Sequence, residues 1–480
     1  MARLAHDAAR TQNGGVASDG RVEAATLARL LGEWARSGTA LPHALAGSIG
    51  ELLTVGVLAD RAVLPSQRAL AAALGVSRGT VTEAYEILRA NEQLLTRRGA
   101  GSELRRPRPL TGTSSPSDGR LASFTGHDSS AVDLSSGALP GLPLVHDAIA
   151  RLDLGAELGT DGYHPAGLPR LRAAIAAQHT ADGLPSEPAQ ILVTNGSQQA
   201  VWLLAHTIVD PGDEVVVEEP TYRGALEAFR SGGATLLAVP VRDDGLDLDL
   251  LDRHLTRHRP RLVYCQPAAH NPTGTTLSPL ARRELADVLG GHGVLTVEDT
   301  SSADLVLDGL GTRTALAHLL PADRTLSVGT TSKLLWGGLR IGWLRGDPAL
   351  IARLTEAKKA IDLGAAVIDQ LLAADLLSHT ARAREQRRVM LLDHLHRTEE
   401  ILRRRRPGWT WPSPAGGTGL WIDTGEDTLA MAERARRHGV LLAAGPAFSA
   451  FNGFGHHLRL PFWPPAARLI EALDRLDRLG

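Results

Sequence analysis

The stretch TLSVGTTSKLLWGGLRIG, residues 325–342, carries the strongest fold signal in the chain. It opens with an apolar, β-rich run that predicts a strand from Thr325 to Val328. The hydroxyl-rich turn TTSK follows, so Lys333 lies just beyond the carboxyl end of that strand, where open α/β sheets bind their ligands. We therefore expect a ligand site in an α/β domain, with Lys333 at its edge.

Similar apolar runs recur along the chain and alternate with amphipathic helical segments such as 168–179 and 281–289. This alternation predicts an α/β domain with a mixed, mostly parallel sheet. The other strands expected in it are 191–194, 214–217, 235–239, 261–265 and 294–297. Helices dominate from about residue 376, with later strands at 418–422 and 457–460, and this predicts a smaller α+β lobe.

Lysine is rare in this chain, and its rarity singles out Lys333. Of the 51 lysines and arginines only Lys333, Lys358 and Lys359 are lysine. A lysine amine can lose its proton and add to a carbonyl, whereas a guanidinium stays protonated. Lys358 and Lys359 are adjacent on a helix-like segment, which we interpret as solvated surface. Lys333 is therefore the candidate nucleophilic amine.

The remaining motifs supply what a phosphorylated aldehyde cofactor needs around such an amine, beginning with its phosphate. The sequence NGSQ follows the strand predicted at 191–194 and opens a helix. The backbone amides of a helix start attract anions. We expect the phosphate to contact Gly196, Ser197, Gln198, Thr330 and Arg340.

Three further residues suit the cofactor ring. Asp299 comes at the end of the strand that runs from Val294 to Glu298, where a buried carboxylate can keep a pyridine nitrogen protonated. Asn271 of HNPTG can donate to the ring oxygen, and Tyr222 of EEPTY can stack on the ring face. Each has a simpler interpretation alone, such as a helix cap for Asp299 or a turn for NPTG. Together with Lys333 they predict a cofactor site.

On these motifs, residues from about 130 to 480 resemble a fold-type I aminotransferase. The resemblance implies pyridoxal 5'-phosphate bound to Lys333 in a head-to-tail homodimer. It also implies that Tyr163 of GYHPAGLPRLRAAI reaches the phosphate of the neighbouring subunit, and that Arg459 of HLRLPF binds a carboxylate of the ligand.

The segment after the ring-nitrogen aspartate departs from the family pattern. Most aminotransferases have a tyrosine shortly after that aspartate, but this chain reads EDTSS, and we place Ser301 at the tyrosine position. Serine is shorter than tyrosine and far less acidic, so the expectation of proton-transfer chemistry weakens. We expect cofactor binding to survive this change better than turnover.

A second constellation lies in LPSQRALAAALGVSRGTVTEAYEILRANEQLLTRRGAGS, residues 64–102. Ser66 starts a helix that breaks at Gly75, and Ser77 caps a second helix. The basic glycine turn RRGAG then separates two short strands, which predicts a hairpin wing. Helix-turn-helix spacing alone fits two packed core helices equally well, but the added wing favours a DNA-binding module.

This segment resembles the GntR-type winged helix. Joined to the second domain, it resembles the MocR-like subfamily of GntR regulators. We expect Arg78 to contact guanine in the major groove. The other predicted DNA contacts, mostly to phosphates, are Arg68, Ser77, Thr80, Arg97, Arg98 and Gly99.

Composition and linker signals set the boundaries of these parts. A Pro-, Gly- and Ser-rich stretch without periodicity predicts a linker. We expect a disordered leader at 1–21, the winged helix at 22–106, the linker at 107–131 and the aminotransferase-like domain at 132–480, with lobes at about 155–375 and 376–480.

The chain has one cysteine, a net charge of -2 and no long apolar run or secretory signal. These features predict a soluble cytoplasmic protein without disulfides, and we expect no membrane partner and no metal site. The fusion predicts a transcription regulator that binds double-stranded DNA and senses an amino compound or the cofactor itself. The alternative is a catalytically active aminotransferase that carries a DNA-binding domain.

Overall fold

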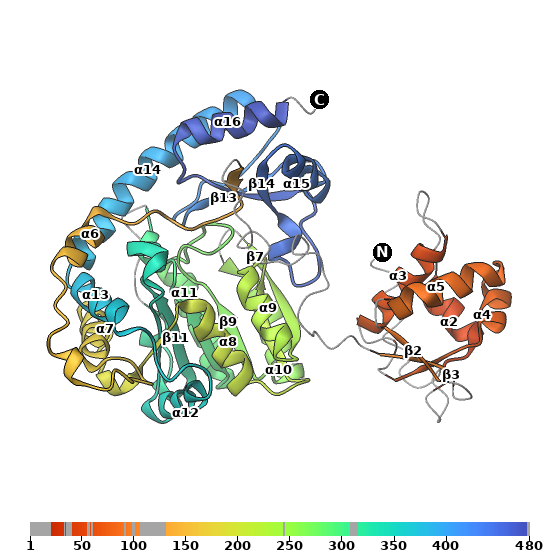
Figure 1. Ribbon diagram of the computed structural model, residues 1–480, viewed down its shortest axis with the longest axis horizontal. Helices are drawn as coiled ribbons and strands as arrows, with labels where there is room; N and C mark the ends of the chain where they lie inside the picture. Colours follow the sequence, from red (N-terminus) through yellow and green to blue (C-terminus); the bar gives the residue numbers. More distant parts are fainter. Residues whose placement is uncertain are drawn as a thin grey trace. The chain divides into compact units, whose positions relative to one another are not determined.

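The computed structural model forms two compact units, Met1–Thr113 and Ser114–Gly480 (Figure 1). Residues 1–20 of the predicted leader and 107–130 of the predicted linker lie outside the described residues. The structure describes residues 21–32, 34, 41–54, 58, 61–90, 93–97, 101–105, 131–242, 245–307 and 315–477. No helix in these ranges is long and apolar enough to cross a membrane.

The first unit is a small helical domain with a three-stranded sheet. Strand β3 pairs antiparallel with both β1 and β2. A single apolar cluster of buried side chains forms its core. The elements in chain order are α2 (Ala24–Leu31), α3 (Leu41–Thr54), β1 (Val63–Leu64), α4 (Gln67–Leu74), α5 (Arg78–Ala90), β2 (Leu94–Arg97) and β3 (Gly101–Leu104).

The helix-turn-helix is built at the positions that the sequence indicates. The Ser66 hydroxyl accepts a hydrogen bond from the Ala69 N–H, and Gly75 ends α4 in the left-handed conformation at φ 68°. The Ser77 hydroxyl accepts from the Thr80 N–H at 3.1 Å, which caps α5. Strand β1 was not predicted, because two residues are too few to show a periodic pattern.

The second unit is dominated by an eight-stranded sheet with the order β5-β12-β11-β10-β9-β6-β7-β8. Its strands are β5 (Ile191–Thr194), β6 (Glu214–Glu219), β7 (Thr235–Arg242), β8 (Gly245–Leu246), β9 (Leu262–Cys265), β10 (Leu295–Asp299), β11 (Thr325–Thr330) and β12 (Gly342–Arg345). The pairs in the centre are parallel. Strand β12 runs antiparallel to β11 and β5, and β8 runs antiparallel to β7, so the predicted mixed sheet is confirmed.

Helices cover both faces of this sheet because its strands are apolar on both sides. Val215 and Val217 face one core with α8 and α9, while Val216 faces another with α10 and α11. The helices of this large lobe are α6 (Pro143–Ala150), α7 (Pro169–Ala181), α8 (Ser197–Thr207), α9 (Arg223–Ser231), α10 (Leu248–His258), α11 (Pro279–His292), α12 (Pro348–Lys359) and α13 (Val367–Leu377).

A smaller lobe is built around a four-stranded sheet with the order β13-β15-β14-β4. Its elements are β4 (Val132–Leu134), α14 (Thr380–Arg405), β13 (Gly419–Asp423), α15 (Thr428–Arg437), β14 (Val440–Ala444), β15 (His457–Pro461) and α16 (Ala466–Asp477). Strand β4 precedes the large lobe in the chain but pairs with β14. The small lobe therefore contains residues from both ends of the second unit. The predicted lobe, which begins near residue 376, does not include β4.

One buried arginine, Arg387, links the segment that carries Lys333 to helix α14 and to the segment before α6. Strand β11 passes into a π-helical turn, Ser332–Trp336. Arg387 of α14 is 1% exposed and donates to the carbonyl groups of Leu334 and Leu335, each at 2.7 Å. Its guanidinium also donates to the Pro140 carbonyl at 2.6 Å. Arg387 thus supplies donors to three backbone acceptors, two of them in buried hydrogen bonds.

We predict that Arg387→Met lowers the free energy of unfolding by about 2–4 kcal/mol, because it leaves buried carbonyl groups without donors. Denaturant unfolding followed by circular dichroism measures the change. The matched control is Arg388→Met on the same helix, whose exposed guanidinium contacts only Glu385 one turn away among the interactions described for it. Equal stability of the two variants would contradict the anchoring role of Arg387.

Candidate functional site

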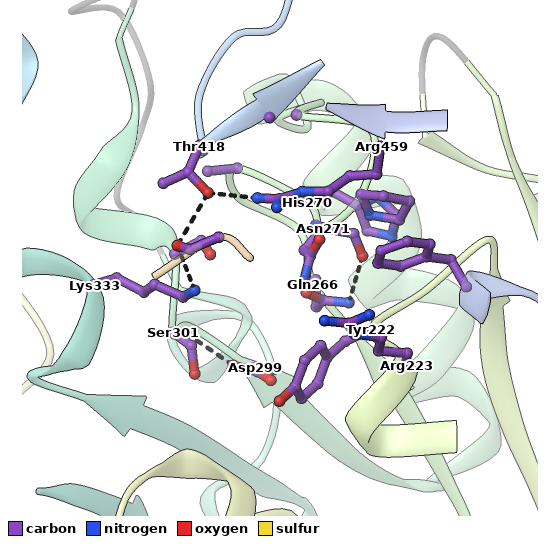
Figure 2. Close-up of a pocket in the computed structure, with 18 of the residues that line it drawn as sticks. Tyr222, Arg223, Gln266, His270, Asn271, Asp299, Ser301, Lys333, Thr418 and Arg459 are labelled. Atoms are coloured by element: carbon purple, nitrogen blue, oxygen red, sulfur yellow. Dashed lines mark hydrogen bonds between the residues drawn. The ribbon is translucent and has the colours of Figure 1, made fainter. Parts of the chain in front are cut away.

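A cavity of about 750 Å³ lies between the two lobes, at the carboxyl ends of the parallel strands (Figure 2). Strands β6, β9, β10 and β11 each end at this edge of the sheet, and the segments that follow them supply lining residues. Thr418, Gly419 and Arg459 of the small lobe close the other side. Six predicted site residues meet here, namely Ser197, Tyr222, Asn271, Asp299, Lys333 and Arg459.

The Lys333 amine points into this cavity and donates to the Gly137 carbonyl at 2.9 Å (Figure 2). Burial, together with the positive charges of Arg459 and Arg223, lowers its pKa to about 8. Asp299 acts in the opposite direction. About a tenth of the amine is therefore neutral at pH 7, far more than for an ordinary lysine, and the neutral form is the one that adds to a carbonyl.

Asp299 is the only carboxylate among the described residues that line the cavity. The Tyr264 hydroxyl donates to its Oδ2 at 2.5 Å, and the Ser301 N–H donates to its Oδ1 at 2.9 Å. Burial raises the pKa of Asp299, and the hydrogen bonds from Ser301 and Tyr264 oppose this rise. A cation placed beside Asp299, such as a protonated ring nitrogen, would stabilise its charged form.

Tyr222 is fixed by a neighbour that was expected to contact phosphate. Its hydroxyl donates to the Gln198 side chain at 2.9 Å, and the Gln198 amide donates to the Gly224 carbonyl at 3.0 Å. Burial raises the pKa of Tyr222 to about 12, so the phenol is neutral. Gln198 does not line the cavity itself, and its side chain positions the aromatic ring.

A cradle of close-packed backbone lies at the start of α8. Gly196 precedes the helix at φ 82°, and a Cβ there would stand 2.5 Å from a guanidinium nitrogen of Arg340. A Cβ on Gly342 would lie 2.6 Å from the Ser197 nitrogen. Arg340 also donates to the Asn195 carbonyl at 3.0 Å. These contacts explain the glycines and bring Arg340 beside a helix N-terminus, an arrangement suited to an anion.

An ion pair between Lys358 and Asp362 supports this cradle through contacts to Asn195 and Gln199. Lys358 is fully buried, and its amine pairs with Asp362 at 2.5 Å. Asp362 also accepts hydrogen bonds from the side chains of Asn195 and Gln199, both at 2.7 Å. Our interpretation of Lys358 as solvated surface was therefore wrong. Of the two adjacent lysines, one faces the core and only Lys359 is exposed.

Arg459 is held in a space cleared by two glycines. It is 5% exposed and donates to the Thr418 hydroxyl at 2.7 Å. A Cβ on Gly137 or Gly419 would lie 2.4 or 2.6 Å from its guanidinium. Burial, together with the positive charge of nearby Arg223, lowers the pKa of Arg459 to about 9. No carboxylate among the described residues lies within ion-pair distance, so a bound anion would stabilise this cation.

Two predicted residues lie away from the cavity. The Thr330 hydroxyl donates to the Ile341 carbonyl at 2.9 Å, and Thr330 lines a separate cavity on the other side of the Lys333 segment. Tyr163 is 65% exposed in this single chain. Its predicted contact with a neighbouring subunit stays a prediction.

Other lining residues were not predicted from the sequence. Arg223, Gln266 and Phe448 all line the cavity, and Gly137 holds the Lys333 amine. A basic residue directly after Tyr222 was a signal that could have indicated Arg223. Gly137 could not be found in this way, because the pairing of β4 with a distant strand brings it to the site.

In the first unit, the described candidate DNA-contacting residues lie at the start of α4, for Arg68, and at the start of α5, for the others. Arg68, Ser77 and Arg78 are exposed, and the Thr80 hydroxyl lies 2.9 Å from that of Ser77. Arg97 ends β2, but its side chain, like Arg98 and Gly99, lies outside the described residues.

Both units match known families. The aminotransferase class I and II family matches residues 129–476, and the gntR family of bacterial regulatory proteins matches residues 43–104. The probable rhizopine catabolism regulatory protein MocR of Rhizobium meliloti is 31% identical over 68% of this chain and 70% of that protein. The HTH-type transcriptional regulator YdfD of Bacillus subtilis is 27% identical over 83% of this chain and 87% of that protein.

Proteins named as aminotransferases are also similar. Aromatic-amino-acid aminotransferase 1 of Thermococcus litoralis is 32% identical over 61% of this chain and 73% of that enzyme. The solved structure of LysN from Thermus thermophilus, complexed with N-(5'-phosphopyridoxyl)-L-leucine, has a TM-score of 0.66 at 28% identity. It covers 73% of this chain and 92% of that chain.

We predict that cofactor-free protein captures pyridoxal phosphate faster as pH rises, with the midpoint of the profile near pH 8, because the neutral Lys333 amine is the reactive form. Arg459→Gln removes a neighbouring positive charge, so the pKa of Lys333 rises and the profile moves to higher pH. Stopped-flow absorbance measures both profiles. Arg404→Gln, an exposed change on α14, is the control and leaves the profile in place. A shift of the Arg459→Gln profile to lower pH would contradict this electrostatic coupling.

Proposed function

Because the chain belongs to the class I and II aminotransferase family and to the MocR-like GntR regulators, a pyridoxal-phosphate-dependent class of transcription regulator, we propose that it senses an amino compound at Lys333 and transmits its occupancy to DNA. The single observation that carries the proposal is the buried amine beside Asp299, in a chain that also contains a gntR-type DNA-binding domain.

The residues in and beside the cavity suit each chemical group of the cofactor. Pyridoxal phosphate, when bound, supplies an aldehyde that condenses with amines and a ring that withdraws electrons. Lys333 presents the amine, and Asp299 would hold the ring nitrogen protonated. Arg340 with the start of α8 would hold the phosphate, and Tyr222 would cover the ring. Arg459 would then bind the carboxylate of an incoming amino compound.

We further propose that the regulator acts as a cytoplasmic homodimer. Tyr163 supports this proposal, because the family resemblance directs it toward the phosphate of a second subunit and its side chain is exposed in the single chain. A dimer would present two winged helices to two half-sites, so its operator would contain repeats with fixed spacing.

A catalytic aminotransferase remains the second candidate function, because Lys333, Asp299, Asn271 and Arg459 all line one cavity. Neither Ser301 nor Ser302 supplies a phenol at this wall. Incubating the loaded protein with a panel of amino acids decides between the two functions. Rapid conversion of the cofactor to its amine form would favour the enzyme, and a stable bound complex would favour the sensor.

We predict that Lys333→Ala abolishes the visible absorbance of bound pyridoxal phosphate and the effect of amino compounds on DNA affinity. In the unaltered protein that effect should be about fivefold or more, a common size for coupling between sites. Spectroscopy and fluorescence anisotropy with the DNA upstream of the gene measure the two changes. Lys359→Ala, at an exposed lysine that pairs with Glu356, is the matched control. Unaltered ligand response in Lys333→Ala would refute the sensing role.

Base and phosphate contacts of the first unit predict different effects on DNA binding. Arg78→Ala should cost about 1–3 kcal/mol at the specific site and less on random duplex, because it removes a base contact. Arg68→Ala should weaken both complexes and reduce the slope of log affinity against log salt by about one. Anisotropy titrations over a salt series measure both effects. Arg89→Ala, near the far end of α5, serves as the control. If Arg78→Ala weakened both duplexes equally, the base contact would be excluded.

A further inference from the structure

The Thr418 hydroxyl lies between Arg459 and the Lys333 amine in the wall of the cavity. Thr418 comes directly before β13 and is 7% exposed. The Arg459 guanidinium donates to its Oγ1 at 2.7 Å, and this oxygen lies 3.4 Å from the Gly137 carbonyl oxygen. The same carbonyl accepts from the Lys333 amine at 2.9 Å. Figure 2 shows these three contacts as one series that runs from Arg459 of the small lobe to Lys333 of the large lobe.

We infer that Thr418 is a positioning residue, which holds Arg459 in the orientation that binds a carboxylate and joins it through the Gly137 carbonyl to the Lys333 amine. This inference rests on the proposed function, because it takes from it the carboxylate role of Arg459. It adds the residue that sets the orientation of Arg459 and a structural link between the two ends of the ligand site.

Arg459 depends on Thr418 because its surroundings offer the guanidinium little else. The bond to Thr418 is the only hydrogen bond of the Arg459 side chain to residues that the structure describes. The side chain is 5% exposed, so water does not readily replace this acceptor. Its Nη2 and Nε face the spaces left by Gly137 and Gly419, where an added Cβ would lie 2.4 and 2.6 Å away. Loss of the hydroxyl would therefore leave a buried donor unpaired and free the guanidinium to turn.

The two contacts of Thr418 fix the direction of its hydroxyl. A guanidinium only donates, so Arg459 meets a lone pair of Oγ1, and the hydroxyl proton is left for another acceptor. The Gly137 carbonyl is the acceptor within reach, and it also receives the Lys333 amine. Valine has nearly the same shape as threonine but no hydroxyl, whereas serine retains the hydroxyl. These two substitutions at position 418 therefore separate hydrogen bonding from packing.

Lys333 reports on the state of Arg459, because charged groups from three elements act on its amine. Burial is the main cause of its lowered pKa. Arg459 of β15 contributes next and then Arg223 of α9, while Asp299 of β10 acts in the opposite direction. A carboxylate bound to Arg459 offsets that positive charge, so the pKa of Lys333 should rise. Capture of pyridoxal phosphate by the neutral amine should then require a higher pH.

The first test uses acetate as a probe on the cofactor-free full chain. Stopped-flow absorbance gives the pH profile of pyridoxal phosphate capture in sodium acetate and in sodium chloride of equal ionic strength. Acetate should move the profile of the unaltered protein to higher pH. In Thr418→Val the same shift should require about tenfold or more acetate, because a hydrogen bond to a charged group contributes on this scale. An equal response of the two proteins to acetate overturns the inference.

The second test compares further variants in the same assay. Thr418→Ser should respond to acetate like the unaltered protein, and loss of its response overturns a role based on hydrogen bonding. The matched control is Thr424→Val, at a buried threonine of the same lobe whose hydroxyl donates to the His456 carbonyl at 2.9 Å away from the cavity. It should keep the full response, and a loss as large as that in Thr418→Val overturns the inference. Arg459→Gln should show no response, and a response there would place the acetate at another site and overturn the inference as well.

The outcomes separate this inference from the proposed function. If acetate shifts the unaltered protein and Thr418→Val at the same concentration, the carboxylate role of Arg459 stands and the positioning role of Thr418 fails. If acetate shifts neither profile beyond the effect of chloride, the carboxylate role fails and the inference fails with it. The sensing function is tested apart from both, by the effect of amino compounds on the DNA affinity of Lys333→Ala.

Discussion

The site depends on positive charge that is buried in the wall of one cavity. Lys333, Arg223 and Arg459 share a cavity with one carboxylate, and burial is the main reason for the lowered pKa of each. Holding cations away from water costs free energy unless an anion or another partner compensates. The cavity is thus most stable when occupied by anionic groups, and its affinity for them is a consequence of how its own side chains are buried.

Close packing of the backbone makes this arrangement possible. Gly137 and Gly419 leave room for the Arg459 guanidinium, and Gly196 leaves room for that of Arg340. Arg387 satisfies the carbonyl groups of the turn that carries Lys333. In each case a packing contact or a backbone hydrogen bond fixes the position of a charged side chain at the site. Stability and ligand binding are therefore built from the same contacts.

Much of this could be predicted from sequence, because the central strands are apolar runs and the cofactor residues follow their ends. Local patterns singled out Lys333, Asp299 and Tyr222, and these residues line one cavity in the structure. What was missed depends on pairing between distant segments. Gly137 reaches the cavity only because β4 adds to the sheet of the small lobe, and β12 is a short strand inserted between β11 and β5. Lys358 shows the complementary error, since adjacent residues on a helix can differ completely in burial.

The origin of the lining residues suggests how occupancy can act beyond the cavity. Lys333, Asp299 and Arg223 belong to the large lobe, whereas Arg459 and Thr418 belong to the small lobe. A ligand that contacts both sets binds best when the lobes are closed, so it must shift their equilibrium by its difference in affinity for the two states. A ligand held only at Lys333 has no such difference to offer. A ligand that contacts Arg459 as well as the Lys333 side of the cavity is therefore a stronger effector than one of equal affinity for the open form that contacts a single lobe.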